Sequence, residues 1–206
     1  MTCTLEYEAA LWAGGARLVG GVDEAGRGCL AGPVVAAAAV VPRDFSHPCL
    51  NDSKKLTPAA RERIYAELRA DGRLLIAFGS ASVEEIDRIN ILRASHLAME
   101  RALRALPEIP DGLLIDGLPV RPFPFPHRGV VGGDALCLSI AAASVIAKVE
   151  RDRLMREAEA DFPGYGFARH KGYGTALHLQ ALRQLGPCPL HRRSFAPVMA
   201  CQKLLF

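Results

Sequence analysis

Two adjacent carboxylates, Asp23 and Glu24, stand between an apolar segment and a loop with glycines on both sides of an arginine. Carboxylate oxygens suit Mg²⁺, which prefers hard oxygen ligands and usually takes one or two from the protein. The glycines of Gly26-Arg27-Gly28 carry no Cβ atom, so the main chain there can approach a bound ligand closely. The segment therefore predicts a metal site beside a backbone contact with substrate. The alternative is a solvated turn after a strand, where acidic residues and glycines are common.

Two further aspartates, Asp116 and Asp134, lie at the edges of apolar segments downstream. Each has a structural alternative, because Asp-Gly is a common turn dipeptide and aspartate is a favoured cap where a helix begins. In an α/β sheet, however, groups at strand ends gather along one edge. Like charges held that close repel each other, and a divalent cation relieves the repulsion. A cluster of three or four carboxylates therefore indicates a metal site.

The position of Glu24 raises a geometric difficulty. Successive residues of a regular strand face opposite sides of a sheet, so Asp23 and Glu24 point the same way only if the strand breaks there. The glycines that follow favour such a break. With all four carboxylates together, two metals roughly 3.5–4 Å apart would form a clamp for phosphoryl displacement, one activating water and the other stabilising the leaving oxygen.

The elements that must position these residues follow from hydrophobic periodicity and capping signals. Thr57-Pro58 places a capping hydroxyl before a proline at the first helical position, and the Val/Ala run at 33–41 is typical of a strand buried on both faces. Strands are expected at residues 17–22, 33–41, 73–79, 113–115 and 130–131, and helices at 57–70, 82–89, 92–106, 134–161 and 175–185. This order predicts an α/β fold with a mixed central sheet flanked by helices.

Composition restricts the class of protein. The chain has 206 residues, of which 50% are hydrophobic and 23% charged, values typical of one folded globular domain. A net charge of +3 is compatible with a polyanionic partner without requiring one. Six cysteines without a Cys-x-x-Cys pair or a signal peptide indicate reduced thiols and a cytoplasmic location. The longest apolar run, 34–41, is too short to span a bilayer, and no exposed apolar repeat calls for assembly, so a monomer is expected.

Several segments fit a nucleic-acid substrate. Basic clusters at 53–55, 169–171 and 191–193 are suited to phosphate contact, although each alone is more typical of a solvated surface. Tyr173 lies between two glycines, where it can stack on a base or sugar or fill a tight turn of the core. Ser144 and Lys148 are one helical turn apart and so share a face, beside an alanine run at 141–143 that suits either close substrate approach or tight helix packing.

These motifs, taken in order, resemble type 2 ribonuclease H, the bacterial ribonuclease HII family. The matching stretches cover nearly the whole chain from about residue 18 to 198; they are residues 21–28, 31–35, 52–56, 115–117, 133–134, 138–144, 147–148, 166–167, 170–175 and 191–197. The resemblance implies a ribonuclease H-like fold with a C-terminal helical portion. It also implies a catalytic domain at 17–198, preceded by an arm or short helix at 1–16 and followed by a tail at 199–206.

The resemblance further implies an activity and a set of site residues. The activity is metal-dependent cleavage of the RNA strand of RNA–DNA hybrids and nicking on the 5′ side of single ribonucleotides embedded in duplex DNA, with Mg²⁺ or Mn²⁺ as cofactor. By position, the metal-binding catalytic residues are Asp23, Glu24, Asp116 and Asp134. Gly26, Arg27 and Gly28 would recognise the ribose 2′-OH, and Tyr173 would stack on the next sugar; Lys54, Ser139, Ser144 and Lys148 would contact the backbone or support the site.

Two other readings of the sequence stay open at this stage. Actin-like sugar kinases and ATPases also place acidic residues beside glycine-rich turns, but they need two such domains around a nucleotide and this chain has room for one. A nucleic-acid-binding protein that has lost catalysis is the second alternative, which four intact carboxylates disfavour. A contact with a replication clamp through the tail after Val198 is a further expectation about partners.

Overall fold

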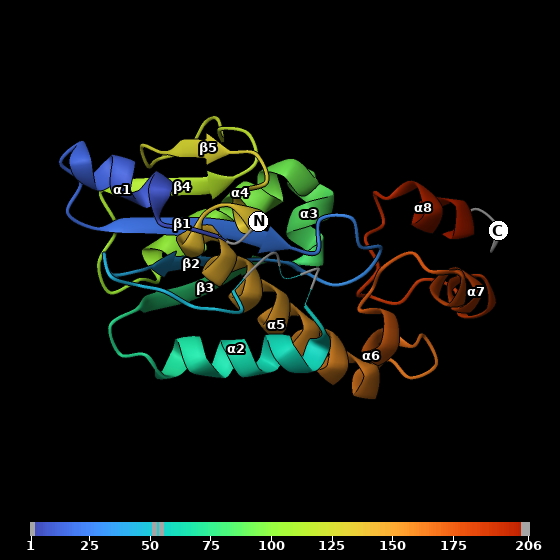
Figure 1. Ribbon diagram of the computed structural model, residues 1–206. Helices are drawn as coiled ribbons and strands as arrows, with labels where there is room; N and C mark the ends of the chain where they lie inside the picture. The colour runs from blue at the N-terminus through green and yellow to red at the C-terminus, as the bar shows by residue number, and fades with distance from the viewer. Residues whose placement is uncertain (1–2, 51–52, 54–55, 203–206) are drawn as a thin grey trace.

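The computed structural model describes residues 3–50, 53 and 56–202, and its centre is a mixed sheet with strand order β3-β2-β1-β4-β5 (Figure 1). The strands are β1 (Val19–Ala25), β2 (Val34–Val40), β3 (Leu75–Ala81), β4 (Gly112–Asp116) and β5 (Arg128–Val130). The first three pair antiparallel, whereas β4 is parallel to both β1 and β5. This arrangement confirms the predicted mixed α/β sheet.

Helices cover both faces of the sheet. The 24-residue helix α5 (Leu138–Asp161) packs on β1 and β2, with α2 (Pro58–Ala70) against it. On the other face α4 (Ile91–Arg104) packs on β2 and β3, preceded by α3 (Val83–Ile89). Side chains of β2 alternate between the two cores: Ala37 contributes to the α5 side and Ala36 to the α4 side. Because β2 is rich in alanine, both helices can lie close to the sheet.

The N-terminal segment holds the start of α5. Residues Glu6–Ala13 form helix α1, as the sequence indicated. Its Glu8 is fully buried, and Glu8 Oε1 accepts hydrogen bonds from Ser139 N–H at 2.9 Å and from the Ser139 hydroxyl at 2.6 Å. Cys137, the residue that precedes α5, gives no side-chain cap of its own. The Glu8 carboxylate of α1 therefore accepts a hydrogen bond from a backbone N–H in the first turn of α5, where negative charge is stabilising.

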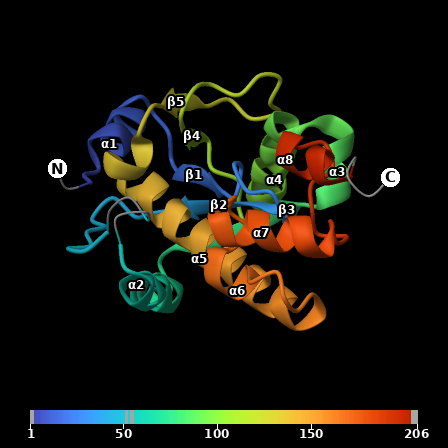
Figure 2. The ribbon, with the colours of Figure 1, turned by 90° about the vertical axis from the view of Figure 1, so that its right-hand side faces the viewer.

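A helical portion follows α5 at the end of the sheet toward which β1 points. It consists of α6 (Phe167–His170), α7 (Ala176–Leu185) and α8 (Ala196–Gln202), grouped together in Figures 1 and 2. The sequence predicted α7 but neither of the two short helices, and α8 crosses the expected tail boundary at residue 198. Hydrogen bonds from Leu30 N–H to Gly172 O and from Arg192 N–H to Leu30 O, at 2.8 and 2.9 Å, join this portion to the loop after β1.

Two predicted boundaries near the acidic residues are wrong. The strand expected to end at Val22 runs on as β1 through Asp23 and Glu24, because both continue to pair with β2. The helix expected to open at Asp134 begins only at Leu138; Gly133–Ala135 instead form a short 3₁₀ turn, η1, entered through Gly132 in a left-handed conformation. Asp134 is therefore not the cap of α5.

Two other expectations concern the whole chain. The six cysteines all lie in the described ranges, and none of them forms a disulfide, as the sequence predicted. Within those same ranges no helix combines the length and apolar character needed to cross a membrane.

Because β1 and α5 lie in close contact at Gly21, adding a single methyl group there should lower the free energy of unfolding. A Cβ added at Gly21 would lie 2.3 Å from the Ser139 carbonyl carbon and from Ile140 N, whereas a Cβ at the exposed Gly72 would meet nothing within 4 Å. Gly21→Ala should lower the free energy of unfolding by about 1–3 kcal/mol because the helix must shift, and Gly72→Ala by less than about 0.5 kcal/mol. Denaturant unfolding of both variants measures this, and equal stabilities would contradict the packing argument.

Candidate active site

Three carboxylates meet at the sheet edge where β1 and β4 end. One oxygen from each of Asp23, Asp116 and Asp134 lies within 4.8 Å of the others. The parallel pairing of Val22 with Ile115 sets the first two side by side. Asp116 Oδ1 accepts a 2.7 Å hydrogen bond from Gly133 N–H, which fixes η1 against the end of β4 and brings Asp134 into the group. The predicted convergence of these three residues at one sheet edge is therefore present in the structure.

The electrostatics of this cluster favour a cation. Asp23 is only 5% exposed, and burial, followed by the charges of Glu24 and Asp116, holds the pKa of Asp23 well above its ordinary value. Hydrogen bonds from the Ser144 hydroxyl and from Glu24 N–H, the latter at 2.7 Å, oppose that rise without overcoming it. A divalent ion would relieve the repulsion and suit three carboxylate oxygens. The donor set therefore fits a hard divalent cation such as Mg²⁺ or Mn²⁺.

Glu24 lies outside the group of three. Because β1 is unbroken, its side chain points to the α4 side of the sheet, where Glu24 Oε1 forms a 3.1 Å ion pair with Arg27 Nη1. Glu24 and Asp116 together line a cavity of about 400 Å³ whose other walls include His96 of α4. The expectation that the strand breaks to turn both carboxylates inward is wrong, and Asp116 at the sheet edge is the residue that the cavity and the cluster share.

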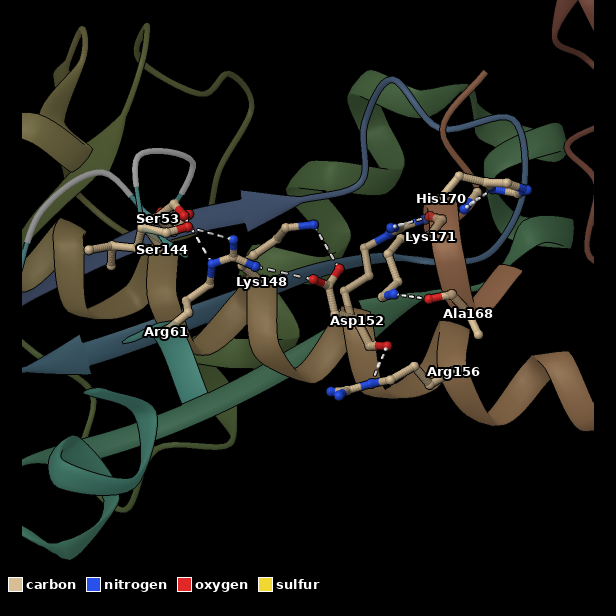
Figure 3. Close-up of polar contacts among 12 residues, drawn as sticks. Ser53, Arg61, Ser144, Lys148, Asp152, Arg156, Ala168, His170 and Lys171 are labelled. Atoms are coloured by element: carbon tan, nitrogen blue, oxygen red, sulfur yellow. Dashed lines mark hydrogen bonds and ion pairs between the residues drawn. The ribbon is translucent and has the colours of Figure 1, made fainter. Parts of the chain in front are cut away.

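Ser144 supports Asp23 from helix α5. Its hydroxyl is buried, bonds to Asp23, and lies 2.8 Å from the Ser53 hydroxyl (Figure 3). Arg61 of α2 in turn donates from Nε to the Ser53 carbonyl at 2.9 Å, so the segment before α2 is attached to the helix beneath the carboxylates. The sequence placed Ser144 at the site, and the structure gives it contact with a carboxylate.

Lys148, one turn further along α5, faces the C-terminal helical portion. Its Nζ is 2.7 Å from Asp152 Oδ1, and Asp152 also pairs with Arg61 at 3.3 Å (Figure 3). Lys148 Nζ lies 5.3 Å from the ring centroid of Tyr173, which is 40% exposed. These residues line a cleft of about 530 Å³ between α2, α5 and α6, with Arg156, Arg169 and Lys171 as further basic members. The cleft is thus predominantly basic.

The glycine loop lies between the carboxylates and Tyr173. Gly26 has φ +96°, and a Cβ there would lie 1.9 Å from Arg151 Nε, so only glycine fits. Arg27 and Gly28 are exposed, and a Cβ at Gly28 would meet open space. The loop therefore presents main chain to solvent within the same region as the metal cluster, while the Arg27 side chain pairs with Glu24.

The remaining residues singled out in the sequence have other surroundings. Ser139 is fully buried against Glu8, where it supports the start of α5 and has no access to solvent. Lys54 lies outside the described residues. In the basic cluster at 191–193, His191 and Arg192 are fully buried and only Arg193 is exposed. The sequence did not reveal what Arg192 does, since a run of basic residues looks the same whether or not it is buried.

A chain of buried histidines supports the turn that carries Tyr173. His191 Nδ1 accepts from Cys188 N–H at 3.0 Å, so its proton is on Nε2, which donates to His178 Nε2 at 3.1 Å. His178 is therefore protonated on Nδ1 and donates to Tyr173 O at 2.9 Å. His170 stacks on the His178 ring with centroids 4.2 Å apart. The link requires His178 and His191 to be neutral, because a second proton on either ring would remove an acceptor.

Solved structures of ribonucleases H share this architecture. The ribonuclease H2 of Pyrococcus horikoshii OT3 aligns with a TM-score of 0.75 at 25% sequence identity, over 91% of this chain and 98% of that one. The ribonuclease HII in the PCNA complex from Archaeoglobus fulgidus aligns with a TM-score of 0.69 at 25% identity, over 86% of this chain and 95% of that one. The sheet order, the acidic edge and these alignments define a ribonuclease H.

Sequence comparison narrows this class to one family. The family model described as Ribonuclease HII matches residues 20–198. The ribonuclease HII of Desulfitobacterium hafniense (strain Y51) is 52% identical over 94% of this chain and 74% of its own length. That of Cereibacter sphaeroides (strain ATCC 17029 / ATH 2.4.9) is 57% identical over 93% of this chain and 90% of its own length. The chain belongs to the ribonuclease HII family, with ribonuclease H activity on RNA–DNA hybrids, which excludes the sugar-kinase alternative.

The histidine chain predicts a loss of stability in acid. Burial, followed by the neighbouring His178, lowers the pKa of His191 from its ordinary 6.5 to about 4. Between these two values the unfolded chain binds more protons than the folded one, so stability is complete above pH 6.5 and falls as the pH drops toward 4, by up to about 3 kcal/mol. When the free energy of unfolding is measured with denaturant across that range, it should change less steeply with pH in His191→Gln than in the unsubstituted protein. Identical slopes would contradict the assignment.

Proposed function

We propose that this ribonuclease HII is a metal-dependent endonuclease that, besides cleaving RNA–DNA hybrids, nicks duplex DNA on the 5′ side of a single embedded ribonucleotide. The observation that carries the proposal is the position of three carboxylates within 4.8 Å of one another beside an exposed glycine loop. A divalent cation held by such a cluster would bind the reacting phosphate, and the loop offers main-chain groups to the ribose next to it. The products are a 3′-hydroxyl and a 5′-phosphate.

The acidic residues have distinct roles in this proposal. Asp23, Asp116 and Asp134 hold Mg²⁺ or Mn²⁺, and Glu24 contributes from the neighbouring cavity that it shares with Asp116. A bound divalent ion polarises the phosphoryl oxygens and activates water near neutral pH. Ser144 keeps Asp23 oriented, since its hydroxyl bonds to that carboxylate. The geometry supports this assignment for the three aspartates, and the resemblance in sequence supports it for Glu24.

Recognition of the ribose falls to main-chain groups. A 2′-OH both donates and accepts hydrogen bonds and is what distinguishes RNA from DNA locally. Gly26, Arg27 and Gly28 are proposed to contact it and the flanking phosphates, because no side chain at Gly28 blocks approach to the backbone. Tyr173, which lines the basic cleft, is proposed to stack on the sugar of the following deoxynucleotide. Recognition of the 2′-OH leaves that group unused as a nucleophile.

Further proposals concern the supporting contacts and partners. Lys148 is suited to a phosphate contact from the basic cleft, and Lys54 keeps the same proposed role. We propose a monomeric enzyme whose catalytic domain spans residues 17–198. The relative from Archaeoglobus fulgidus was solved in a complex with PCNA, and by analogy we propose a clamp contact through the residues after Val198. Of these, 203–206 lie outside the described ranges.

A nicking assay tests the main proposal. The protein should nick a duplex that contains one ribonucleotide when Mg²⁺ or Mn²⁺ is added, and should leave both the all-DNA duplex and the metal-free sample intact. Asp134→Asn should lower turnover by more than about 100-fold, because a metal ion supplies several kcal/mol of charge stabilisation. Thermal unfolding of the variant serves as the folding control. An uncut ribonucleotide duplex in the presence of metal would restrict the protein to hybrid cleavage or to binding alone.

A substitution of Tyr173 separates stacking from packing. Stacking of one base on an aromatic ring is worth about 1–3 kcal/mol, so Tyr173→Ala should slow cleavage at an RNA-to-DNA junction by about tenfold or more. Tyr173→Phe keeps the ring and should retain most of the activity. Since the ring is 40% exposed, thermal stability should change little in either variant. Parallel losses of stability and activity in the alanine variant would show that the ring serves the fold.

A further inference from the structure

Arg192 is buried in an unusual environment. Its side chain is fully inaccessible, and within the described residues no carboxylate forms an ion pair with it. Main-chain carbonyls surround it instead: Nη2 donates to Gly26 O at 2.7 Å, Nη1 to Arg27 O at 2.8 Å, and Nε to Gly32 O at 3.0 Å. A fourth contact, from Nη2 to Pro33 O, measures 3.3 Å. Two of these four bonds therefore go to the glycine loop, and the other two go to the residues just before β2.

These contacts determine which way the loop presents its peptide groups. In a trans peptide the C=O of one residue and the N–H of the next point in opposite directions. Because the carbonyls of Gly26 and Arg27 point inward to Arg192, the N–H groups of Arg27 and Gly28 point away from it. Both residues are exposed, and neither N–H has an acceptor among the residues that the structure describes. Two adjacent donors therefore face solvent with a cation behind them.

Arg151 of α5 binds the carbonyls of neighbouring segments, just before β2 and just before Tyr173. It is also fully buried and donates to the carbonyls of Ala31, Pro33 and Lys171 at 3.0, 3.0 and 2.8 Å. Arg151 packs against Gly26, but its hydrogen bonds go to these other carbonyls and to neither Gly26 O nor Arg27 O. Arg192 is thus the described side chain that orients the two exposed peptides. Burial, followed by the charge of Arg151, lowers the pKa of Arg192 to about 10, so it stays charged at neutral pH.

We propose that Arg192 is a positioning residue for substrate recognition: by binding the carbonyls of Gly26 and Arg27, it aims the N–H groups of Arg27 and Gly28 at the ribose and its phosphate. A cation on the carbonyl side of a peptide also polarises that peptide and strengthens its N–H as a donor. The inference rests on the proposed function of the glycine loop. It replaces the simple interpretation of residues 191–193 as a patch that contacts phosphate directly, since a buried guanidinium has no access to the nucleic acid.

The test compares Arg192→Met with Arg183→Met, which removes the same charge from the exposed surface of α7. Cleavage of an RNA–DNA hybrid and of the single-ribonucleotide duplex is measured with Mg²⁺, and hybrid affinity is measured with Ca²⁺ in place of Mg²⁺ at several salt concentrations. Arg192→Met should lower kcat/KM by about tenfold or more. This is less than the roughly 100-fold cost of removing a transition-state hydrogen-bond donor, because the two N–H groups remain but lose their orientation. Arg183→Met should stay within about twofold. Arg192→Lys, with one nitrogen for four carbonyls, should fall between.

The salt dependence of hybrid affinity distinguishes positioning from direct contact. Each phosphate contact made by a cationic side chain contributes about 0.9 to the slope of log K against log salt concentration. Arg192→Met should weaken binding while leaving that slope unchanged. A decrease of about 0.9 in the slope would identify a direct phosphate contact and overturn the inference, as would activity within twofold of the unsubstituted protein in a folded Arg192→Met.

Amide exchange in the unsubstituted protein tests the same geometry independently of how the variants fold. The amide protons of Arg27 and Gly28 should exchange rapidly in the free protein and become protected when a hybrid binds. Protection in the free protein, or none in the complex, would overturn the inference. If the unsubstituted protein cleaves hybrids but leaves the ribonucleotide duplex intact, the proposed nicking function fails, and hybrid cleavage by the variants still decides the role of Arg192.

Discussion

Mutual repulsion among buried carboxylates is the constraint on which this structure depends. Asp23, Asp116 and Asp134 are brought together by the parallel pairing of β1 with β4 and by the hydrogen bond from Gly133 N–H to Asp116. Burial first, and then the charges of Glu24 and Asp116, raise the pKa of Asp23, so a charged carboxylate is disfavoured there without a cation. Backbone pairing holds the three groups in place. The stability of the sheet therefore keeps the carboxylates together against their electrostatic repulsion.

Helix α5 connects the parts of the site. Ser144, Lys148 and Arg151 are spaced so that they share one face, and each contacts a different functional element: the carboxylate Asp23, the ring of Tyr173, and the carbonyls of the loop after β1. The acidic sheet edge, the basic cleft and the glycine loop are therefore all attached to this one helix. Because Glu8 of α1 bonds to the first turn of α5, the N-terminal helix also helps to support these elements.

Local signals in the sequence predicted local structure well. The cap at Thr57 was predictable because it bonds to a backbone group three residues ahead. The three-aspartate cluster was predictable from strand ends and motif order. The extension of β1, the turn that holds Asp134 and the burial of Arg192 were not predictable, since they depend on partners 12 to 166 residues away. A fully buried arginine that forms no ion pair with a carboxylate is also rare, so the composition of the segment does not predict it.

The long separation between Arg192 and the loop that it binds has a consequence for biosynthesis. The hydrogen bond from Arg192 to Arg27 O joins residues 165 positions apart. Chains emerge from the ribosome N-terminus first, so the five strands and α5 are all available before the residue that completes the glycine loop has been translated. A nascent or prematurely terminated chain would contain the residues of the acidic edge but lack the arginine that binds the glycine loop. The proposed recognition of the ribose would therefore be completed only when synthesis is almost finished.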